Sequence, residues 1–192
     1  MTFSVLVCDA GHQPHHWTTK EDGIVLKVKN LIAYEMGDPA TFRGGVSRMT
    51  GERSQIDVAP IIFLKNVLKY DSRTPPLTNK NLFARDRHIC AFCGRHYPEH
   101  KLSREHIIPS SRGGPNNWKN CISACKACNH AKADMTLEEA GMELLFIPYV
   151  PNTAEKLLMQ NRRILADQAE FLKAMLPEHS RLLGEQFPTY TM

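Results

Sequence analysis

Two Cys-x-x-Cys pairs, Cys90/Cys93 and Cys125/Cys128, are the side chains of this 192-residue sequence best suited to hold a metal ion. Each pair places two thiolates within reach of one tetrahedral ion, and two pairs complete the four-sulfur shell that structural zinc prefers. The 31 residues between Cys93 and Cys125 are more than a simple zinc ribbon needs. We therefore expect a structural Zn²⁺ held by these four cysteines, and further chemistry in the loop between the pairs.

An acid and an imidazole, Glu105 and His106, are adjacent in this loop, and the amide Asn120 follows. An imidazole titrates at pH ~6.5, so it can take a proton from water at neutral pH. Adjacent residues of a regular strand point to opposite faces, so Glu105 and His106 can serve one site only if the strand bends or ends there. Pro109 and the glycines after it favour such an ending.

The same stretch resembles the HNH nucleases of the ββα-metal type, in the branch that carries a four-cysteine zinc site. The resemblance is strongest over about residues 81–145, and a weaker similarity to bacterial stand-alone HNH proteins reaches back to the Val5-Leu6-Val7 segment. The last forty residues are outside it. It is carried by Arg85-Asp86, Cys90-x-x-Cys93-Gly94, Glu105-His106-Ile107-Ile108-Pro109, Gly113-Gly114, Trp118-x-Asn120, Ala124-Cys125-x-x-Cys128-Asn129, Lys132 and Glu138-Glu139-Ala140-Gly141-Met142.

The resemblance implies a role for each residue of the motif. His106 is expected to be the general base, and Glu105 with the side-chain oxygen of Asn129 is expected to hold a catalytic Mg²⁺ or Mn²⁺. Asn120 is expected to brace the loop that carries the histidine. Two departures stand out: the family commonly has Asp where this chain has Glu105, and the third letter of the motif is Asn129, with the adjacent His130 as its rival.

Positive charge is concentrated in the same region. Residues 85–133 hold nine Lys/Arg against three Asp/Glu, a net +6, so the other residues carry −2 of the overall +4. This is the sign expected beside a phosphate backbone, although ordinary surface charge is the alternative. The candidates for phosphate contacts are Arg104, Arg112, Lys119 and Lys132.

The remaining features of the composition predict a cytoplasmic protein that does not enter a membrane. No apolar run approaches the eighteen or more residues of a membrane span. The first residues lack the basic start, apolar run and cleavage site of a signal peptide, which argues against a disulfide framework. Cys8 and Cys121 are left single.

The order of elements predicts an α+β fold with a ββα-metal core and four-cysteine zinc knuckles. A strand is expected over about 102–108, a second short apolar piece after Trp118, and a helix from near Cys125 to about Lys132. Helices are also expected over about 19–31, 78–85 and 136–145, and Thr19 and Thr136 are the predicted caps of the first and the last of these. The predicted domains are a β-rich N-terminal module (1–77), the nuclease core (78–150) and a C-terminal helical extension (151–192).

The C-terminal extension is expected to contain one long helix from Asn152 to about Met175. Its apolar pairs Leu157-Leu158, Ile164-Leu165 and Phe171-Leu172 recur every seven residues. Such a stripe either packs on the core or forms a homodimer, and Asn161 and Gln168 interrupt a strict coiled-coil seam.

Two N-terminal segments leave alternatives open. His12, His15 and His16 are close enough to suggest a metal site, but no acid or cysteine stands at usable spacing and Pro14 favours a turn. Residues 37–54 predict loops or a loose hairpin, and its three arginines either touch phosphates or are simply solvated; they are Arg43, Arg48 and Arg53.

Together these observations predict a metal-dependent endonuclease that hydrolyses DNA, most readily double-stranded DNA. The alternative is a zinc-stabilised nucleic-acid-binding protein without catalysis. The joint presence of Glu105, His106, Asn120 and Asn129 in motif register favours the enzyme, because binding alone does not require these four side chains.

Overall fold

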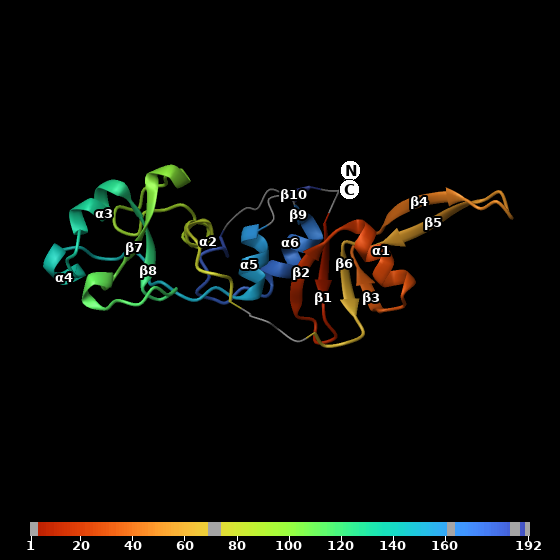
Figure 1. Ribbon diagram of the computed structural model, residues 1–192, viewed down its shortest axis with the longest axis horizontal. Coiled ribbons are helices and arrows are strands. Elements are labelled where there is room, and N and C mark those ends of the chain that lie inside the picture. The colour runs from red at the N-terminus through yellow and green to blue at the C-terminus, as the bar shows by residue number, and fades with distance from the viewer. Residues whose placement is uncertain (1–3, 69–73, 161–163, 185–188, 191–192) are drawn as a thin grey trace. The chain divides into compact units, whose positions relative to one another are not determined.

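The computed structural model describes residues 4–68, 74–160, 164–184 and 189–190, and the chain forms two compact units (Figure 1). The first unit combines residues 4–68 with Gln160, 164–175 and 189–190. The second combines residues 74–159 with 176–184. Among the helices of these described residues, none has the length and apolar character needed to cross a bilayer.

A four-stranded mixed sheet forms the centre of the first unit, in the order β2-β1-β6-β3. β1 and β6 run parallel, and the other pairs are antiparallel. Pro60 directly precedes β6, so it starts an inner strand without removing a donor from the ladder. The β-rich character predicted for this region is confirmed. The strands are β1 (Val5–Cys8), β2 (Pro14–Thr18), β3 (Ile32–Met36) and β6 (Ile61–Leu64).

The first unit also contains two helices, a separate hairpin and two short strands. The hydroxyl of Thr19 accepts a hydrogen bond from the Asp22 N–H at 3.1 Å, which confirms the predicted cap of the first helix. The hydrophobic core contains Val5, Val7 and Ile62 from the sheet and Leu165 from the C-terminal part of the chain. These elements are α1 (Lys20–Val28), the hairpin of β4 (Ala40–Val46) and β5 (Arg53–Val58), β9 (Ile164–Leu165), α6 (Ala166–Lys173) and β10 (Thr189–Tyr190).

One histidine of the N-terminal group has an acidic partner that its sequence spacing did not suggest. The Nε2 of His15 lies 3.2 Å from a carboxylate oxygen of buried Asp9. The other carboxylate oxygen accepts hydrogen bonds from the N–H groups of Gly11 and Gln13. Asp9 therefore closes the turn between β1 and β2, and the expectation that no acid is available to these histidines is wrong.

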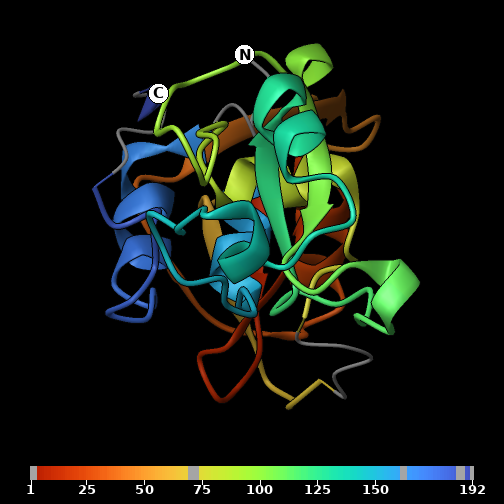
Figure 2. The same cartoon turned by 90° about the vertical axis from the view of Figure 1, so that its left-hand side faces the viewer.

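The second unit contains the predicted strand, strand and helix. β7 and β8 pair in antiparallel register from Leu102↔Cys125 to His106↔Cys121, and α3 packs against both strands (Figure 2). This confirms the order expected for the core. The elements are α2 (Asn79–Arg85), the short 3-10 turns η1 (Glu99–Lys101) and η2 (Ser110–Arg112), β7 (Leu102–His106), β8 (Cys121–Cys125), α3 (Lys126–Lys132) and α4 (Leu137–Ala140).

The helix α4 is shorter than predicted. The capping box of Thr136 and Glu139 is present, with each side chain bonded to the other residue's N–H. The helix nevertheless ends at Ala140 and not near Leu145, because Gly141 takes a left-handed conformation with φ 59°.

A buried ion pair holds the second unit together. Arg85 and Asp86 are both inaccessible to solvent, and two guanidinium nitrogens of Arg85 lie 2.8 and 3.1 Å from the Asp86 carboxylate. The same guanidinium donates to the backbone carbonyls of Trp118, Cys121 and Tyr149. One side chain thus joins α2, the start of β8 and a segment more than sixty residues later.

The predicted single helix from Asn152 to Met175 is wrong. The structure has α5 (Thr153–Gln160) in its place, followed after residues 161–163, which lie outside the described part, by the strand β9 and the helix α6. The apolar stripe is divided between the two units and buried, with Leu157, Ile164 and Leu172 at 0–1% exposure. Because the described apolar residues of the stripe are used in packing, we do not retain the homodimer expected through this helix.

Candidate active site

The four paired cysteines converge on one point. Cys90 and Cys93 stand in a turn before β7, Cys125 ends β8, and Cys128 lies in α3. Their sulfur atoms are all within 4.8 Å of one another. A tetrahedral zinc site with Zn–S bonds of about 2.3 Å has sulfur pairs about 3.8 Å apart, so the cluster needs little adjustment to hold the ion. It is compatible with zinc in both donor type and spacing.

Hydrogen bonds around these thiols shift their proton affinities. Burial raises the pKa of Cys125, but the N–H of Cys128 and neighbouring side chains, including the Tyr97 hydroxyl, outweigh it and lower the pKa to about 7. For Cys93, burial likewise raises the pKa and hydrogen bonds lower it overall. Burial is the largest cause that raises the pKa of Cys90 and Cys128. Four thiols at such short range favour a cation that replaces their protons.

Glu105 is buried in β7 and is paired with a lysine from α3. The ammonium of Lys132 lies 2.8 Å from a Glu105 carboxylate oxygen and 2.8 Å from the backbone carbonyl of His106. Lys132 is fully buried and Glu105 is 7% exposed. A buried charge is stable only with its partner, so the lysine fixes the position of the carboxylate and of the end of β7.

Asn129 faces β7 from the same side of α3 as Lys132. Its side-chain amide donates to the Ser103 hydroxyl at 2.7 Å, an orientation that leaves its oxygen as the atom able to bind a cation. Residues two apart on a strand share a face, as do residues three apart on a helix. Ser103 and Glu105 therefore meet Asn129 and Lys132 across one surface. Ser103 was not among the predicted site residues, and its position two residues before Glu105 is the signal that could have identified it.

His106 is the last residue of β7. The pairing remains regular up to His106↔Cys121, so the strand ends at this residue and does not bend before it. The Nε2 atom of His106 is buried and has no hydrogen-bond partner among the described residues. The rival third letter, His130, has an exposed side chain.

Asn120 braces the segment that follows His106. Its side-chain oxygen accepts from the Ile108 N–H at 2.9 Å, and its amide donates to the carbonyls of Ile108 and Pro115 at 3.1 and 3.0 Å. Its backbone carbonyl also accepts from the Ile107 N–H. Gly114 passes so close to the Ile108 carbonyl that a Cβ atom would overlap it. The loop thus has one compact conformation.

The four basic residues proposed for phosphate contacts have different surroundings. The guanidinium of Arg104 donates to Asn79, Asn116 and the Leu77 carbonyl, so it joins segments of the second unit. Arg112 is exposed and pairs with Glu139 at 2.8 Å. Lys119 is exposed. Lys132 is buried with its ammonium bonded inside the protein, so we do not retain it as a phosphate contact.

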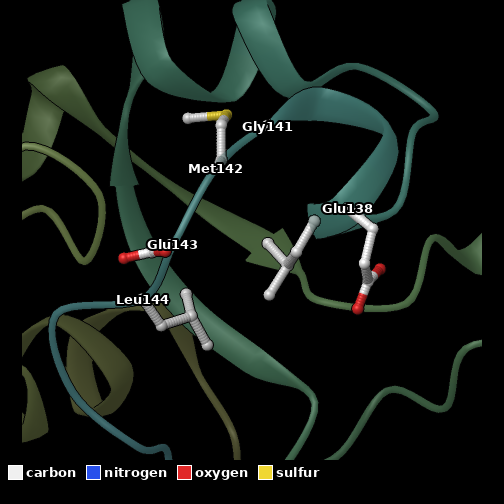
Figure 3. Close-up of a pocket in the computed structure, with 6 residues that line it drawn as sticks. Glu138, Gly141, Met142, Glu143 and Leu144 are labelled. Atoms are coloured by element: carbon white, nitrogen blue, oxygen red, sulfur yellow. The ribbon is translucent and has the colours of Figure 1, made fainter.

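A separate hollow of about 490 Å³ lies beside α4. It is lined by Leu137, Glu138 and the segment 141–144, and Met142, Glu143 and Leu144 follow one another along the loop that leaves the helix (Figure 3). None of the predicted catalytic residues lines it. Its two carboxylates also make it unsuited to a phosphate, so we assign it no part in the chemistry.

Comparison with known proteins agrees with this geometry. Residues 90–145, which contain the cysteine cluster, β7, β8 and α3, match the family described as HNH endonuclease. This region of the chain is thus similar to HNH endonucleases. The family resemblance inferred from the sequence motifs is confirmed.

A curated relative of the chain is the "SPbeta prophage-derived putative HNH endonuclease YoqL" of Bacillus subtilis (strain 168). It is 34% identical over 61 residues, which cover 26% of this chain and 25% of the relative. The chain therefore spans about a quarter of the length of the curated relative that it matches.

Proposed function

We propose that this protein is a metal-dependent endonuclease that hydrolyses phosphodiester bonds in DNA, and double-stranded DNA in particular. The observation that carries the proposal is the surface where β7 faces α3, with Glu105 and Asn129 on opposite sides and His106 at the end of the strand. The match of residues 90–145 to the HNH endonuclease family supports it. The activity belongs to the domain that we propose for residues 78–150.

His106 is proposed as the general base. Its buried Nε2 has no partner among the described residues, so it is free to take the proton of a water molecule that enters the site. Asn120 keeps the histidine in place, because its side chain holds the backbone of Ile108 and its backbone carbonyl accepts from the Ile107 N–H. Lys132 is proposed as a positioning residue, because it binds both the Glu105 carboxylate and the His106 carbonyl.

The oxygen donors fit a hard divalent cation. Glu105 and the side-chain oxygen of Asn129 would hold Mg²⁺ or Mn²⁺, which prefer carboxylate and amide oxygens and retain several waters. When bound, the cation would stabilise negative charge on the phosphate and on the leaving oxygen. Exposed Arg112 and Lys119 are the residues of this region that we propose for phosphate contacts.

The cysteine cluster is proposed to hold a structural Zn²⁺ that takes no part in hydrolysis. Four sulfur ligands close a tetrahedral shell and leave no open position for water or substrate. The fit is supported by the mutual 4.8 Å limit of the four sulfur atoms.

Supercoiled plasmid, incubated with pure protein and Mg²⁺, Mn²⁺ or no added cation, tests the proposal. We expect cation-dependent cleavage, and His106→Ala should reduce its rate by on the order of 10² or more while DNA binding persists. Glu105→Ala and Asn129→Ala should weaken the response to added Mg²⁺, because each removes an oxygen ligand. Glu105→Ala also leaves the buried Lys132 ammonium without its carboxylate partner, so thermal melting of this variant must accompany its cleavage assay. His130, the exposed neighbour of Asn129, supplies the control, and His130→Ala should cleave at the wild-type rate.

Two results would contradict this assignment. Cleavage by His106→Ala at the wild-type rate would exclude the base, and DNA binding without any cleavage by the wild type would favour the non-catalytic binding protein. Loss of cleavage in His130→Ala, with Asn129→Ala unaffected, would move the third letter of the motif to His130.

A further inference from the structure

The hairpin of β4 and β5 is a two-stranded sheet of its own that extends from the first unit (Figure 1). We call residues 40–58 the arginine ribbon. Its base is anchored, because Val58 is fully buried and Ala40 and Phe42 pack against the core of the unit. Its outer part is exposed on both strands. A ribbon that is fixed at one end and solvated at the other is suited to reach a partner.

The strand register places two arginines on one face of the ribbon. Arg43 pairs with Gln55, and Val46 pairs with Arg53 after a bulge at Gly44-Gly45. Cross-strand partners point the same way, and so do residues two apart along a strand, so Arg43, Arg53 and Gln55 share a face. The opposite face, which contains Phe42, turns its apolar residues to the core.

The tip of the ribbon is a defined turn. The Ser47 N–H donates to the Glu52 carbonyl at 2.8 Å, and the Ser47 hydroxyl accepts from the N–H groups of Met49 and Thr50. Met49 is 96% exposed. The tip therefore presents an ordered backbone with a large apolar side chain that has almost no cover from the protein.

The charge of the ribbon is complementary to a polyanion. Residues 41–54 contain three arginines and one glutamate, a net +2. Arg43, Arg48 and Arg53 are all exposed, and in the described part of the chain none of them pairs with a carboxylate. Neutralising them would require an anion from outside the protein.

We infer that the arginine ribbon binds double-stranded DNA by entering the major groove. The major groove of B-form DNA, about 12 Å wide, admits a two-stranded ribbon. Arg43 and Arg53 would contact phosphates from one face, and Met49 would meet the apolar thymine methyl groups at the floor of the groove. The inference rests on the proposed function in one respect, that DNA is the substrate. It adds a second DNA-binding element in the unit that does not contain the cysteine cluster.

Binding of the full chain to a fluorescent duplex tests this inference, without added divalent cation so that no cleavage occurs. The variant Arg43→Gln/Arg53→Gln is compared with Lys29→Gln/Lys65→Gln, which removes two exposed charges from the same unit outside the ribbon. We expect the ribbon variant to bind about 10-fold more weakly and to lower the salt dependence by about two counterions. The control should change binding by less than about 2-fold.

Equal losses in the two variants would overturn the inference, since net charge alone would then explain the binding. Duplex RNA of the same sequence is the second probe, because its deep, narrow major groove excludes a ribbon. An equally large loss on RNA would overturn groove entry. Plasmid cleavage by the same preparations separates the two proposals: a wild type that binds through the ribbon but never cleaves contradicts only the nuclease, and a ribbon variant with wild-type binding contradicts only the ribbon.

Discussion

At the residue scale, Asn120 holds the backbone of the loop that follows His106. It forms one hydrogen bond as acceptor and two as donor, all to the backbone of the loop after His106. It is 6% exposed, so an unsatisfied carbonyl or N–H left by its removal would have limited access to water. The position of the histidine thus depends on an amide fourteen residues later.

Replacement of Asn120 should lower activity more than it lowers stability. Asn120→Ala is expected to cost about 1–3 kcal/mol, because it leaves buried backbone groups without partners. Asn120→Asp keeps the acceptor for Ile108 N–H but loses both donors, so it should retain zinc and still fail to hold the loop. Plasmid cleavage and zinc content, measured on both variants, check this; wild-type cleavage by Asn120→Ala would show that the loop does not need the brace.

At the scale of elements, the cysteine cluster fixes the junction between β8 and α3. Cys125 ends the strand and also caps the helix, since its sulfur accepts from the Cys128 N–H at 3.5 Å. Cys90 and Cys93 bring in the turn before β7, and the Ala91 N–H adds a bond to the Ser123 carbonyl of β8. A zinc ion would close this arrangement and so determine where Asn129 faces β7.

Loss of a single sulfur ligand should therefore release the metal. We expect Cys93→Ser to lower zinc content from one ion per chain and to lower the melting temperature by about 10 °C, as a loss of roughly 3 kcal/mol would in a chain of this size. The control is Cys121→Ser, a buried cysteine outside the cluster, which should destabilise the core but keep the zinc. Elemental analysis with thermal melting distinguishes them, and full zinc in Cys93→Ser would show that the cluster is not the ligand set.

At the scale of the whole molecule, the C-terminal residues are divided between the two compact units. Residues 164–175 belong to the first unit and 176–184 to the second. In the second unit, the Ser180 hydroxyl donates to the buried carboxylate of Glu155 at 2.6 Å, and the Tyr149 hydroxyl donates to the same oxygen at 2.7 Å. Beside them, Leu182 is 1% exposed. Residues 176–184 are therefore structural.

Two adjacent leucines test this role. Leu182→Ala should destabilise the protein by about 2–5 kcal/mol, because it opens a cavity in a packed site. Leu183→Ala removes the same type of side chain from a position that is 47% exposed, so it should lower the free energy of unfolding by less than about 1 kcal/mol. Chemical denaturation of the full chain provides the measurement. If Leu182→Ala cost as little as Leu183→Ala is expected to cost, residues 176–184 would be a dispensable extension.

The sequence alone determined the features that depend on near neighbours. Thr19 and Thr136 predicted helix starts, because a cap needs only a donor three residues later, and the two Cys-x-x-Cys pairs predicted a metal cluster, because thiols so close in sequence can share an ion. The strand, strand and helix between them followed from the order of apolar runs and turns. These signals are local, so they can be interpreted without knowledge of the rest of the chain.

Only the tertiary structure decided which distant groups meet. Lys132 was predicted at the surface, yet it is buried because Glu105, 27 residues earlier, supplies the opposite charge that makes burial possible. The helix expected over 152–175 was divided because two separate units each bury part of its apolar stripe, a gain that helical periodicity cannot anticipate. The spacing of residues in the sequence therefore identified the candidates for chemistry. Long-range packing decided which of these side chains face one another.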